Sequence, residues 1–249
     1  MDVKQNPVLP QNTIIIRPFC PADTPQVRDV YFTGLVTGAD SAGHIALVRA
    51  FLHWTPMYLA YLLSITGGVA LFLPQQHIRL FGLALVLLSC SFMLFEYYRI
   101  RTTFLGYYQD GLLHDMADIS QYYGLNQEKD GPIRSFWVAE IPSEQGYKIV
   151  GCVALDCPPK SDGPMTGELR RLFVLPAYRK RGIGTKLIRA LICYAKQRGV
   201  PTLKLETTNY QSVAREMYTR LGWRHNSTRD SDFEAGGLRM NFIEYQMQL

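Results

Sequence analysis

Two long runs without a charged residue restrict the folds open to this chain of 249 residues. The first covers the twenty residues from Trp54 to Leu73, and a helix of that length, rising about 1.5 Å per residue, matches the roughly 30 Å hydrocarbon thickness of a bilayer. The second runs from Leu80 to Phe95 and reaches a spanning length with its flanking residues. A short polar segment containing Arg79 separates them. The pattern predicts a transmembrane helical hairpin over residues 54–98.

A pair of fully buried helices in a soluble core is the alternative, but soluble helices are rarely apolar on every face. Arg49, Arg99 and Arg101 flank the outer ends of the two runs, against Arg79 between them. The positive-inside rule therefore favours a cytosolic side for both ends. The first twelve residues contain no apolar stretch, so we expect no secretory signal peptide.

The formal net charge of +5 is too small for a surface that binds nucleic acid throughout, and no nucleic-acid partner is expected. Any anion site must come from a local cluster of cations. The five cysteines are an odd number, contain no CxxC pair and lack histidines at zinc spacing. We expect reduced thiols that pack in the core rather than nucleophiles, and no metal.

The remaining residues alternate between helical and strand patterns. Strands are expected at Thr13–Phe19, Ser135–Ile141, Tyr147–Asp156, Glu168–Leu175, Thr202–Thr207 and Leu238–Leu249. Helices are expected after Pro21 and at Ala42–His53, Gly111–Tyr123, Thr185–Arg198 and Gln211–Leu221. Imperfect alternation in Glu168–Leu175 indicates a bulge. The polar segments Cys157–Thr166 and His225–Gly237 are expected to be loops.

The segment from Arg170 to Arg189 carries seven cations and no acid in twenty positions. Its order is a strand, a basic turn containing Gly182 and Gly184, and then a helix. This order directs backbone amides and the positive end of a helix at an anion, and glycines let the chain approach it closely. The segment therefore predicts a site for a phosphate-bearing ligand.

Three other interpretations of the segment fit its sequence less well. A dinucleotide fingerprint would need a third glycine at Leu187, although Glu206 lies about twenty residues further on. A P-loop would need a GxxxxGK string followed by Ser or Thr, which the sequence lacks. A solvated helix start would explain the cations but not Gly182 and Gly184 behind Arg179.

The pattern Arg179-x-x-Gly182-x-Gly184, after a strand that ends Val174-x-Pro176, resembles the acyl-CoA loop of the GNAT superfamily of N-acyltransferases. Downstream, Ala214 to Tyr218 and then Leu221-Gly222-Trp223 resemble its second motif. The resemblance covers roughly residues 136–223, and residues 14–23 are similar to the family's first strand and helix start. It implies an α+β fold, with a mixed, mostly antiparallel sheet flanked by helices.

Within the superfamily, the chain is similar to the membrane-anchored Camello-like acetyltransferases, which insert an apolar hairpin after the first strand. The runs that carry this likeness are Asp115–Ile119, Phe136–Glu140 and Asn209–Gln211. It implies an acetyltransferase domain made of residues 1–53 and 99–249, with the hairpin of residues 54–98 in the endoplasmic reticulum membrane and the catalytic domain facing the cytosol. Known members acetylate aspartate, cysteine conjugates or protein lysines.

The resemblance also implies a set of site residues. Tyr218 would protonate the leaving thiolate, and Glu168 would accept the amine proton; a packed core tyrosine and a surface carboxylate paired with Arg170 or Arg171 are the alternatives. An oxyanion donor is expected near Phe173 or Val174. The expected coenzyme contacts are Phe173, Val174, Arg179, Lys180, Arg181, Gly182, Ile183, Gly184, Thr185, Asn209 and Gln211, the last at a position where the superfamily often has Asn.

Other polar and aromatic side chains lie near the end of the predicted hairpin, and the sequence does not assign them a single role. His114, close to Asp115 and Asp118, is a possible base or substrate contact. The tyrosines of this region are expected either at the membrane interface or in an acceptor pocket: Tyr107, Tyr108, Tyr122 and Tyr123.

The leading hypothesis is an acetyl-CoA-dependent N-acetyltransferase that acts on a primary amine in a ternary complex and contacts the bilayer through residues 54–98. A membrane-tethered acyl-CoA-binding or scaffold protein without turnover is the alternative. A nucleic-acid binder that uses the basic segment is a third hypothesis, and it would show salt-dependent binding without competition by CoA. The acceptor and the oligomeric state stay open.

Overall fold

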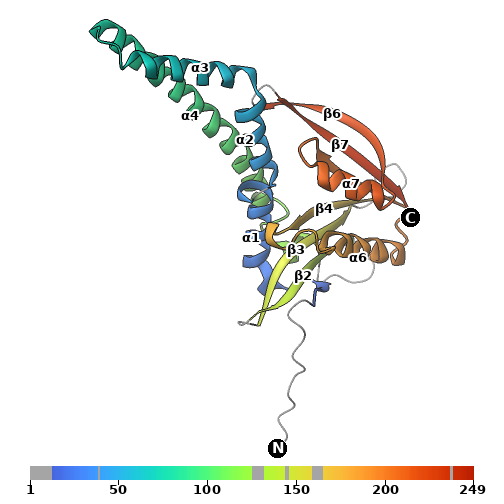
Figure 1. The fold of residues 1–249 in the computed structure, drawn as a ribbon. Coiled ribbons are helices and arrows are strands. Elements are labelled where there is room, and N and C mark those ends of the chain that lie inside the picture. The colour runs from blue at the N-terminus through green and yellow to red at the C-terminus, as the bar shows by residue number, and fades with distance from the viewer. Residues whose placement is uncertain (1–12, 39, 125–131, 144–145, 159–164, 236–237) are drawn as a thin grey trace, which may run out of the picture.

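The computed structural model describes residues 13–38, 40–124, 132–143, 146–158, 165–235 and 238–249. Its centre is a sheet of seven strands in the order β1-β2-β3-β4-β5-β7-β6 (Figure 1). All neighbouring strands are antiparallel except the parallel pair β4 and β5. The predicted mixed, mostly antiparallel sheet is therefore confirmed. The strands are β1 Ile15–Pro18, β2 Ile133–Ser143, β3 Gly146–Cys157, β4 Thr166–Val174, β5 Thr202–Thr208, β6 Arg224–Ala235 and β7 Leu238–Gln248.

Helices cover both faces of the sheet because apolar side chains on its central strands alternate in direction. On β2, Trp137 and Ala139 face one apolar cluster, whereas Phe136 and Val138 face another. The first cluster contains residues of α6 (Ile183–Gln197) and α7 (Ser212–Arg220). The second contains residues of α1 (Thr24–Phe32) and α5 (Ile119–Tyr122). The sheet is thus the middle layer of a three-layer domain.

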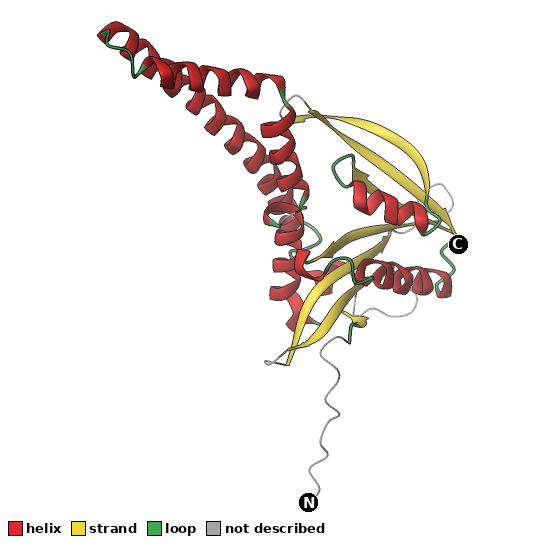
Figure 2. Ribbon diagram, viewed as in Figure 1, coloured by secondary structure: helices red, strands yellow, loops and turns green. Residues whose placement is uncertain are grey.

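A third apolar cluster joins two helices to the outer strands. It brings together Ala46 of α2 (Ala42–His53), Phe104 of α4 (Gln76–Leu113) and Met240 of β7. α4 is one continuous helix of 38 residues, so its second half packs on the domain while its first half leaves it. The far end of α4 and the whole of α3 (Thr55–Ala70) extend away from the sheet (Figure 2).

We call α3 together with residues 76–98 of α4 the arm. Its two helices pack side by side, with Ser64 Oγ and Ser89 Oγ 2.6 Å apart. A Cβ atom at Gly67 would lie 2.6 Å from the carbonyl oxygen of Gly82, whereas one at Gly68 would meet nothing within 4 Å. The helices therefore touch at Gly67, and Gly68 faces outward.

Most apolar side chains of the arm are exposed, including Ile65 at 65%, Phe81 at 64% and Leu88 at 64%. Among the described helices, α4 has the length and hydropathy needed to cross a membrane, and only 11% of its most apolar window is buried. α3, with 16 residues, is shorter than that length criterion. The apolar exterior agrees with the sequence pattern that predicts a membrane segment.

Replacing Gly67 with valine should separate the arm helices, because the new side chain would collide with the backbone of Gly82. Overpacking of this kind costs about 1–3 kcal/mol. Oxidative cross-linking of a Ser64→Cys, Ser89→Cys pair measures the effect and should slow severalfold. The matched control is Gly68→Val, which should leave cross-linking unchanged; equal slowing by both variants would contradict this packing.

Two expected segments differ from the structure. Gly111–Tyr123 is not one helix, because α4 ends at Leu113 and a turn precedes the short α5, which Asp118 caps by accepting from the N–H of Gln121. The expected loop His225–Gly237 lies largely within β6, which pairs with β7. β6 is a polar edge strand with one neighbour, so its sequence lacks the apolar alternation of a buried strand. Most of the expected loop Cys157–Thr166 lies outside the described residues.

Candidate active site

The sheet opens between its two parallel strands. β4 pairs with β5 from Thr166 to Leu169, while β5 continues along β7 as far as Thr208. β4 stays paired with β3 up to Val174. Among the described positions, β4 and β5 therefore share no pairing beyond Leu169. The edge of β4 that faces β5 keeps backbone groups free for a ligand.

The second half of β4 presents Val174 to this opening. The N–H of Leu175 donates to the carbonyl oxygen of Val150 on β3, at 2.9 Å. Because backbone groups alternate in direction along a strand, the N–H and C=O of Val174 point the other way, toward β5. Phe173 instead faces β3 with its backbone and packs its ring 5.2 Å from that of Tyr31. Of the two expected oxyanion donors, Val174 is the one that faces the gap.

A basic turn connects β4 to α6. The non-glycine residue Lys180 has φ +61°, and Gly182, the N-cap of α6, has φ +75°. The first α-helical bond runs from the N–H of Lys186 to the carbonyl of Gly182, so the amides of Ile183, Gly184 and Thr185 have no acceptor within the helix. With the positive helix end, these amides form a cradle for an anion.

The cations of the turn take different directions. Arg179 bends back toward β4, where its Nε donates to the carbonyl oxygen of Val174 at 3.0 Å and its Nη1 lies 3.6 Å from Asp40. Burial lowers the pKa of Arg179. Arg181 is exposed and lies over the ring of Tyr178. Arg179 thus joins the turn to the open strand, while the charge of Arg181 stays at the surface.

Tyr218 lies on α7, which packs against the start of α6. A Cβ atom at Gly184 would lie 3.2 Å from the sulfur of Met217, the residue before Tyr218. The Tyr218 side chain is 6% exposed, and its ring lies 6.0 Å from that of Tyr245. Burial raises the pKa of Tyr218, so its phenol stays protonated across the physiological range. The structure therefore brings the helix that bears Tyr218 to the first turn of α6.

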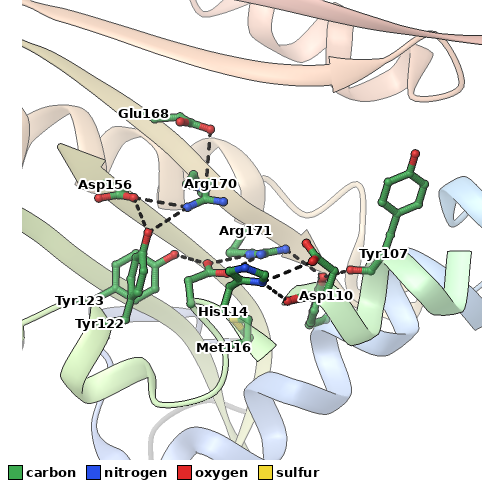
Figure 3. A network of polar contacts seen from close by, with 12 residues as sticks. Tyr107, Asp110, His114, Met116, Tyr122, Tyr123, Asp156, Glu168, Arg170 and Arg171 are labelled. Carbon is green, nitrogen blue, oxygen red and sulfur yellow. Dashed lines mark hydrogen bonds and ion pairs between the residues drawn. The ribbon is translucent and has the colours of Figure 1, made fainter. Parts of the chain in front are cut away.

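Glu168 lies on the opposite face of β4 from the cluster that contains Leu169 and Tyr218. Figure 3 shows Arg170 between Glu168 and Asp156, with distances of 3.7 Å and 3.3 Å. Burial raises the pKa of Glu168, and the charge of Arg170 opposes that rise. The Glu168 carboxylate and the Tyr218 ring thus lie on opposite faces of the sheet rather than side by side.

Two predicted coenzyme contacts are engaged elsewhere. The side-chain amide of Asn209 donates to the carbonyl oxygen of Arg239 at 3.0 Å, and its oxygen accepts from the N–H of Asn241 at 3.2 Å. The side-chain oxygen of Gln211 accepts from Thr207 Oγ1 at 2.6 Å. Asn209 therefore anchors β7 to the end of β5, and Gln211, at the N-cap position of α7, binds β5 through its side chain rather than capping the helix with it.

Of the four tyrosines near the end of α4, Tyr107 is exposed at 39%, whereas Tyr122 and Tyr123 pack within the domain. Tyr122 OH donates to Asp156 at 2.9 Å, and Tyr123 is fully buried and donates to Asp115. His114 is exposed and lies 3.4 Å from Asp110 in the turn that follows α4. Of these groups, Tyr122 contacts Arg170, whose Nη1 donates to the Tyr122 hydroxyl at 3.3 Å.

Cys152 illustrates why the buried thiols suit packing rather than nucleophilic attack. It is fully buried in β3, and its thiol donates to the carbonyl oxygen of Arg171 at 3.3 Å. Burial raises its pKa to about 12, so the thiolate is scarcely populated near neutral pH.

A buried ion pair at β4 was missed in the sequence. The Arg171 guanidinium donates to both carboxylate oxygens of Asp115, which is 0% exposed. Tyr123 donates to the same carboxylate, and Arg171 also donates to the hydroxyl of Tyr31 at 2.9 Å. Arg171 and Asp115 lie 56 positions apart, and neither helical nor strand periodicity connects them. The Asp115–Ile119 run was the one signal that marked this region.

An opened mixed sheet beside a basic, glycine-containing helix start defines a protein with the acetyltransferase type of fold and site. Residues 97–223 match the acetyltransferase (GNAT) family, and the chain belongs to that family. N-acetyltransferases are named among its relatives: it is 35% identical to a probable N-acetyltransferase camello of Xenopus tropicalis over 51% of this chain and 53% of that protein. It is 26% identical to an N-acetylaspartate synthetase of Danio rerio over 96% of this chain and 80% of that one.

The chain spans about half the length of the first curated relatives that it matches, at 53%, 50% and 49%. The N-acetyltransferase from Staphylococcus aureus Mu50 has a similar fold, with a TM-score of 0.50 and 12% identity over 95% of this chain and 99% of that one.

Proposed function

We propose that this chain is an acetyl-CoA-dependent N-acetyltransferase that transfers the acetyl group to a primary amine in a ternary complex. The observation that carries the proposal is the parting of β4 and β5 after Leu169, next to the unpaired first amides of α6. Acetyl-CoA has an extended pantetheine arm, which can pair with an open strand edge, and a diphosphate, which an anion cradle can bind. The two features adjoin here.

On the donor side, the diphosphate of acetyl-CoA binds the amides of Gly182–Thr185, with Lys180 and Arg181 supplying positive charge. The pantetheine arm runs along β4 beside Phe173 and Val174 and forms hydrogen bonds with the strand edge that β5 leaves open. Arg179 holds the turn against Val174 so that the cradle and the open edge keep a constant separation.

The chemistry requires a neutral amine, a polarised carbonyl and a proton for the leaving thiolate. Glu168 accepts a proton from the ammonium form of the acceptor, directly or through a water molecule, and the neutral amine nitrogen then attacks the thioester carbon. The N–H of Val174 stabilises the oxyanion that forms. When the carbon–sulfur bond breaks, Tyr218 donates its proton to the CoA thiolate, and the nitrogen of the new amide gives its second proton to the tyrosinate.

The acceptor class is proposed as a primary amine of an amino acid, a cysteine S-conjugate or a protein lysine. Relatives named N-acetylaspartate synthetase support the inclusion of L-aspartate among the first compounds to test. The test incubates the purified full chain in detergent with labelled acetyl-CoA and a panel of these amines. Acetylated amine should form only when both compounds are present.

Calorimetric titration of CoA separates the enzyme from its alternative. CoA binding without acetylation of any amine in the panel would support the membrane-tethered acyl-CoA-binding protein and contradict the proposed activity. Salt-dependent binding of DNA that CoA does not displace would instead favour the nucleic-acid binder.

Replacing Gly182 with alanine should weaken CoA binding about tenfold, because a strained or shifted cradle loses charge-assisted hydrogen bonds worth roughly 1.5 kcal/mol. The residue has φ +75°, and this region costs an L-residue about 1–2 kcal/mol. The matched control is Gly199→Ala at the other end of α6, which has φ +69° and equally open surroundings. Both variants should lose similar thermal stability, and only the first should lose CoA affinity; equal affinity in both would contradict the cradle.

We also propose that residues 54–98 cross the bilayer as a helical hairpin, in the endoplasmic reticulum, with the catalytic domain in the cytosol. The exposed apolar arm and the cations Arg49, Arg99 and Arg101 at its base support this placement. Extraction of microsomes with alkaline carbonate tests membrane integration, and the protein should stay in the pellet. Protease added to intact microsomes tests orientation, and it should digest the catalytic domain without detergent. Protection of the domain would reverse the proposed orientation.

A further inference from the structure

We propose that Asp115 is a positioning residue for acetyl transfer: through Arg171 it holds the bulge of β4 that aims the Val174 N–H at the thioester oxygen. The proposal rests on the proposed function, because it assigns Asp115 a part in that reaction. Asp115 lies two residues after the end of α4 and belongs to no strand of the sheet.

The bulge is centred on Arg171. β3 pairs Cys152 with Phe173 but Ala154 with Arg170, so one residue of β3 faces two of β4. Arg171 has φ +53°, a region that residues with a side chain rarely adopt. Such a bulge inserts an extra residue and changes the direction of the side chains around it.

The side chains after Leu169 show this change of direction. Arg170 and Arg171 are consecutive, yet both reach the same face of the sheet, where Arg170 meets Asp156 (Figure 3). On that face Arg171 meets Asp115. An unbulged strand would send them to opposite faces. Leu172 then returns to the other apolar cluster.

The same change decides which amide faces the opening. Directions alternate along a strand, so an extra residue at 171 reverses the direction of each amide after it. With the bulge, the N–H of Val174 points toward β5. Without it, the N–H of Phe173 would point there and that of Val174 would turn toward β3.

Asp115 supplies the interactions that hold Arg171 in this conformation. Its carboxylate accepts from Nε and Nη2 of Arg171, with Nε at 2.8 Å, and from Tyr123 OH. Burial alone would raise the pKa of Asp115, but the bonds to Arg171 keep that pKa below its ordinary value. Tyr31 completes the arrangement, because its hydroxyl accepts from Nη1 of Arg171 at 2.9 Å and donates to the carbonyl oxygen of Tyr107 at 3.1 Å. The ionised carboxylate is thus the one charge that balances Arg171 within this network.

The test compares Asp115→Asn with Asp23→Asn. Asp23 is also 0% exposed and also accepts from two nitrogens of one arginine, Nη1 and Nη2 of Arg17, at 2.7 and 2.8 Å, but it lies at the β1 edge, three strands from β4. Asp115→Asn should lower kcat about 10- to 100-fold, since loss of one oxyanion donor costs about 10²–10³ and the amide is displaced rather than removed. KM for acetyl-CoA should stay within about threefold of the wild-type value, because the amides of Gly182–Thr185 that bind the diphosphate do not contact Asp115 or Arg171. Asp23→Asn should lose comparable thermal stability and keep kcat.

Hydrogen exchange measured by mass spectrometry supplies a readout that needs no turnover. Amides of residues 170–174 should exchange faster in Asp115→Asn than in wild type, and at the wild-type rate in Asp23→Asn. If wild type acetylates no amine, the proposed function fails while this comparison still tests the positioning of β4.

A milder variant keeps the proposal testable if Asp115→Asn does not fold. Tyr31→Phe removes only the hydroxyl that Arg171 reaches and should lower kcat about threefold to tenfold, within the range for a lost hydrogen bond to a charged group. The proposal is overturned if Asp115→Asn folds with wild-type kcat and exchange, or if Asp23→Asn loses as much kcat as Asp115→Asn. It is also overturned if Tyr31→Phe, tested in its place, keeps the wild-type kcat.

Discussion

A Tyr218→Phe variant should keep its fold and its affinity for acetyl-CoA and lose about 100-fold or more in kcat, the usual contribution of a positioned general acid. The ring is buried against Trp223 and Tyr245, and phenylalanine retains that packing. Only the proton for the leaving thiolate is lost.

The wild-type enzyme should also keep its activity at alkaline pH. Because burial raises the pKa of Tyr218, its phenol should stay protonated beyond the ordinary tyrosine range, so activity should show no loss near pH 10 from this group.

Steady-state kinetics with a saturating amine measures this prediction, and calorimetric titration of acetyl-CoA checks binding. The matched control is Tyr245→Phe, in the same apolar cluster, whose hydroxyl lies 3.4 Å from Nε of Arg215. It removes one hydroxyl from a ring that packs on Tyr218 and leaves the Tyr218 hydroxyl in place. A Tyr218→Phe enzyme with the kcat of the Tyr245→Phe control would show that Tyr218 is only a packed core tyrosine.

A Glu168→Gln variant should lose about 100- to 1,000-fold in kcat/KM while its KM for acetyl-CoA changes little, because the amide cannot accept the amine proton. Its size is preserved, and the ion pair with Arg170 is a long 3.7 Å contact at a partly exposed side chain. The lost pair should therefore affect stability by less than about 1 kcal/mol.

The pH profile of the wild type gives the second measure of Glu168. A base acts only when it is deprotonated, so kcat/KM should be full above the pKa of Glu168 and should fall as the pH drops through it. Burial raises that pKa above its ordinary value of 4.5, so the fall should begin at a higher pH than for an exposed glutamate. The residual activity of Glu168→Gln should lack this acid limb.

Glu206→Gln is the matched control for the base. Glu206 lies on β5 two residues after Lys204, the partner of Glu168, so it shares that face of the sheet, and it pairs with Arg229 at 3.2 Å. Its replacement should alter the acid limb little. If Glu206→Gln abolished the limb and Glu168→Gln kept it, the base would be Glu206.

Much of the fold could be predicted from local pattern. Strands and helices with one buried face repeat apolar residues at a period of 2 or 3.6, as in β2 and α6, and both were expected close to their observed bounds. β6 was missed because its partner covers only one edge and its faces stay polar. The single helix expected at Gly111–Tyr123 was wrong, because α4 ends at Leu113 and Asp115, in the turn that follows, binds Arg171 of β4.

Part of the candidate site could be predicted from local sequence, and part depends on residues that are distant along the chain. The order of strand, basic turn and helix was predictable because it is contiguous: β4, the cations, Gly182 and α6 follow one another within a few positions. Phosphate binding by this turn stays a prediction. The roles assigned to Tyr218 and Glu168 stay predictions. The hydrogen bonds that occupy Asn209 could not be foreseen, since its partners Arg239 and Asn241 lie about thirty positions away.

The order of residues alone therefore determined the apolar arm, the periodic elements and the basic glycine turn, because each depends on neighbours within a turn or a strand. Tertiary structure decided where β4 leaves β5, which amide faces the opening and which carboxylate holds Arg171. Those outcomes depend on pairs that lie far apart along the chain. Their contact energies arise only after the chain has paid the entropy of closing the intervening loops, and no local pattern records them.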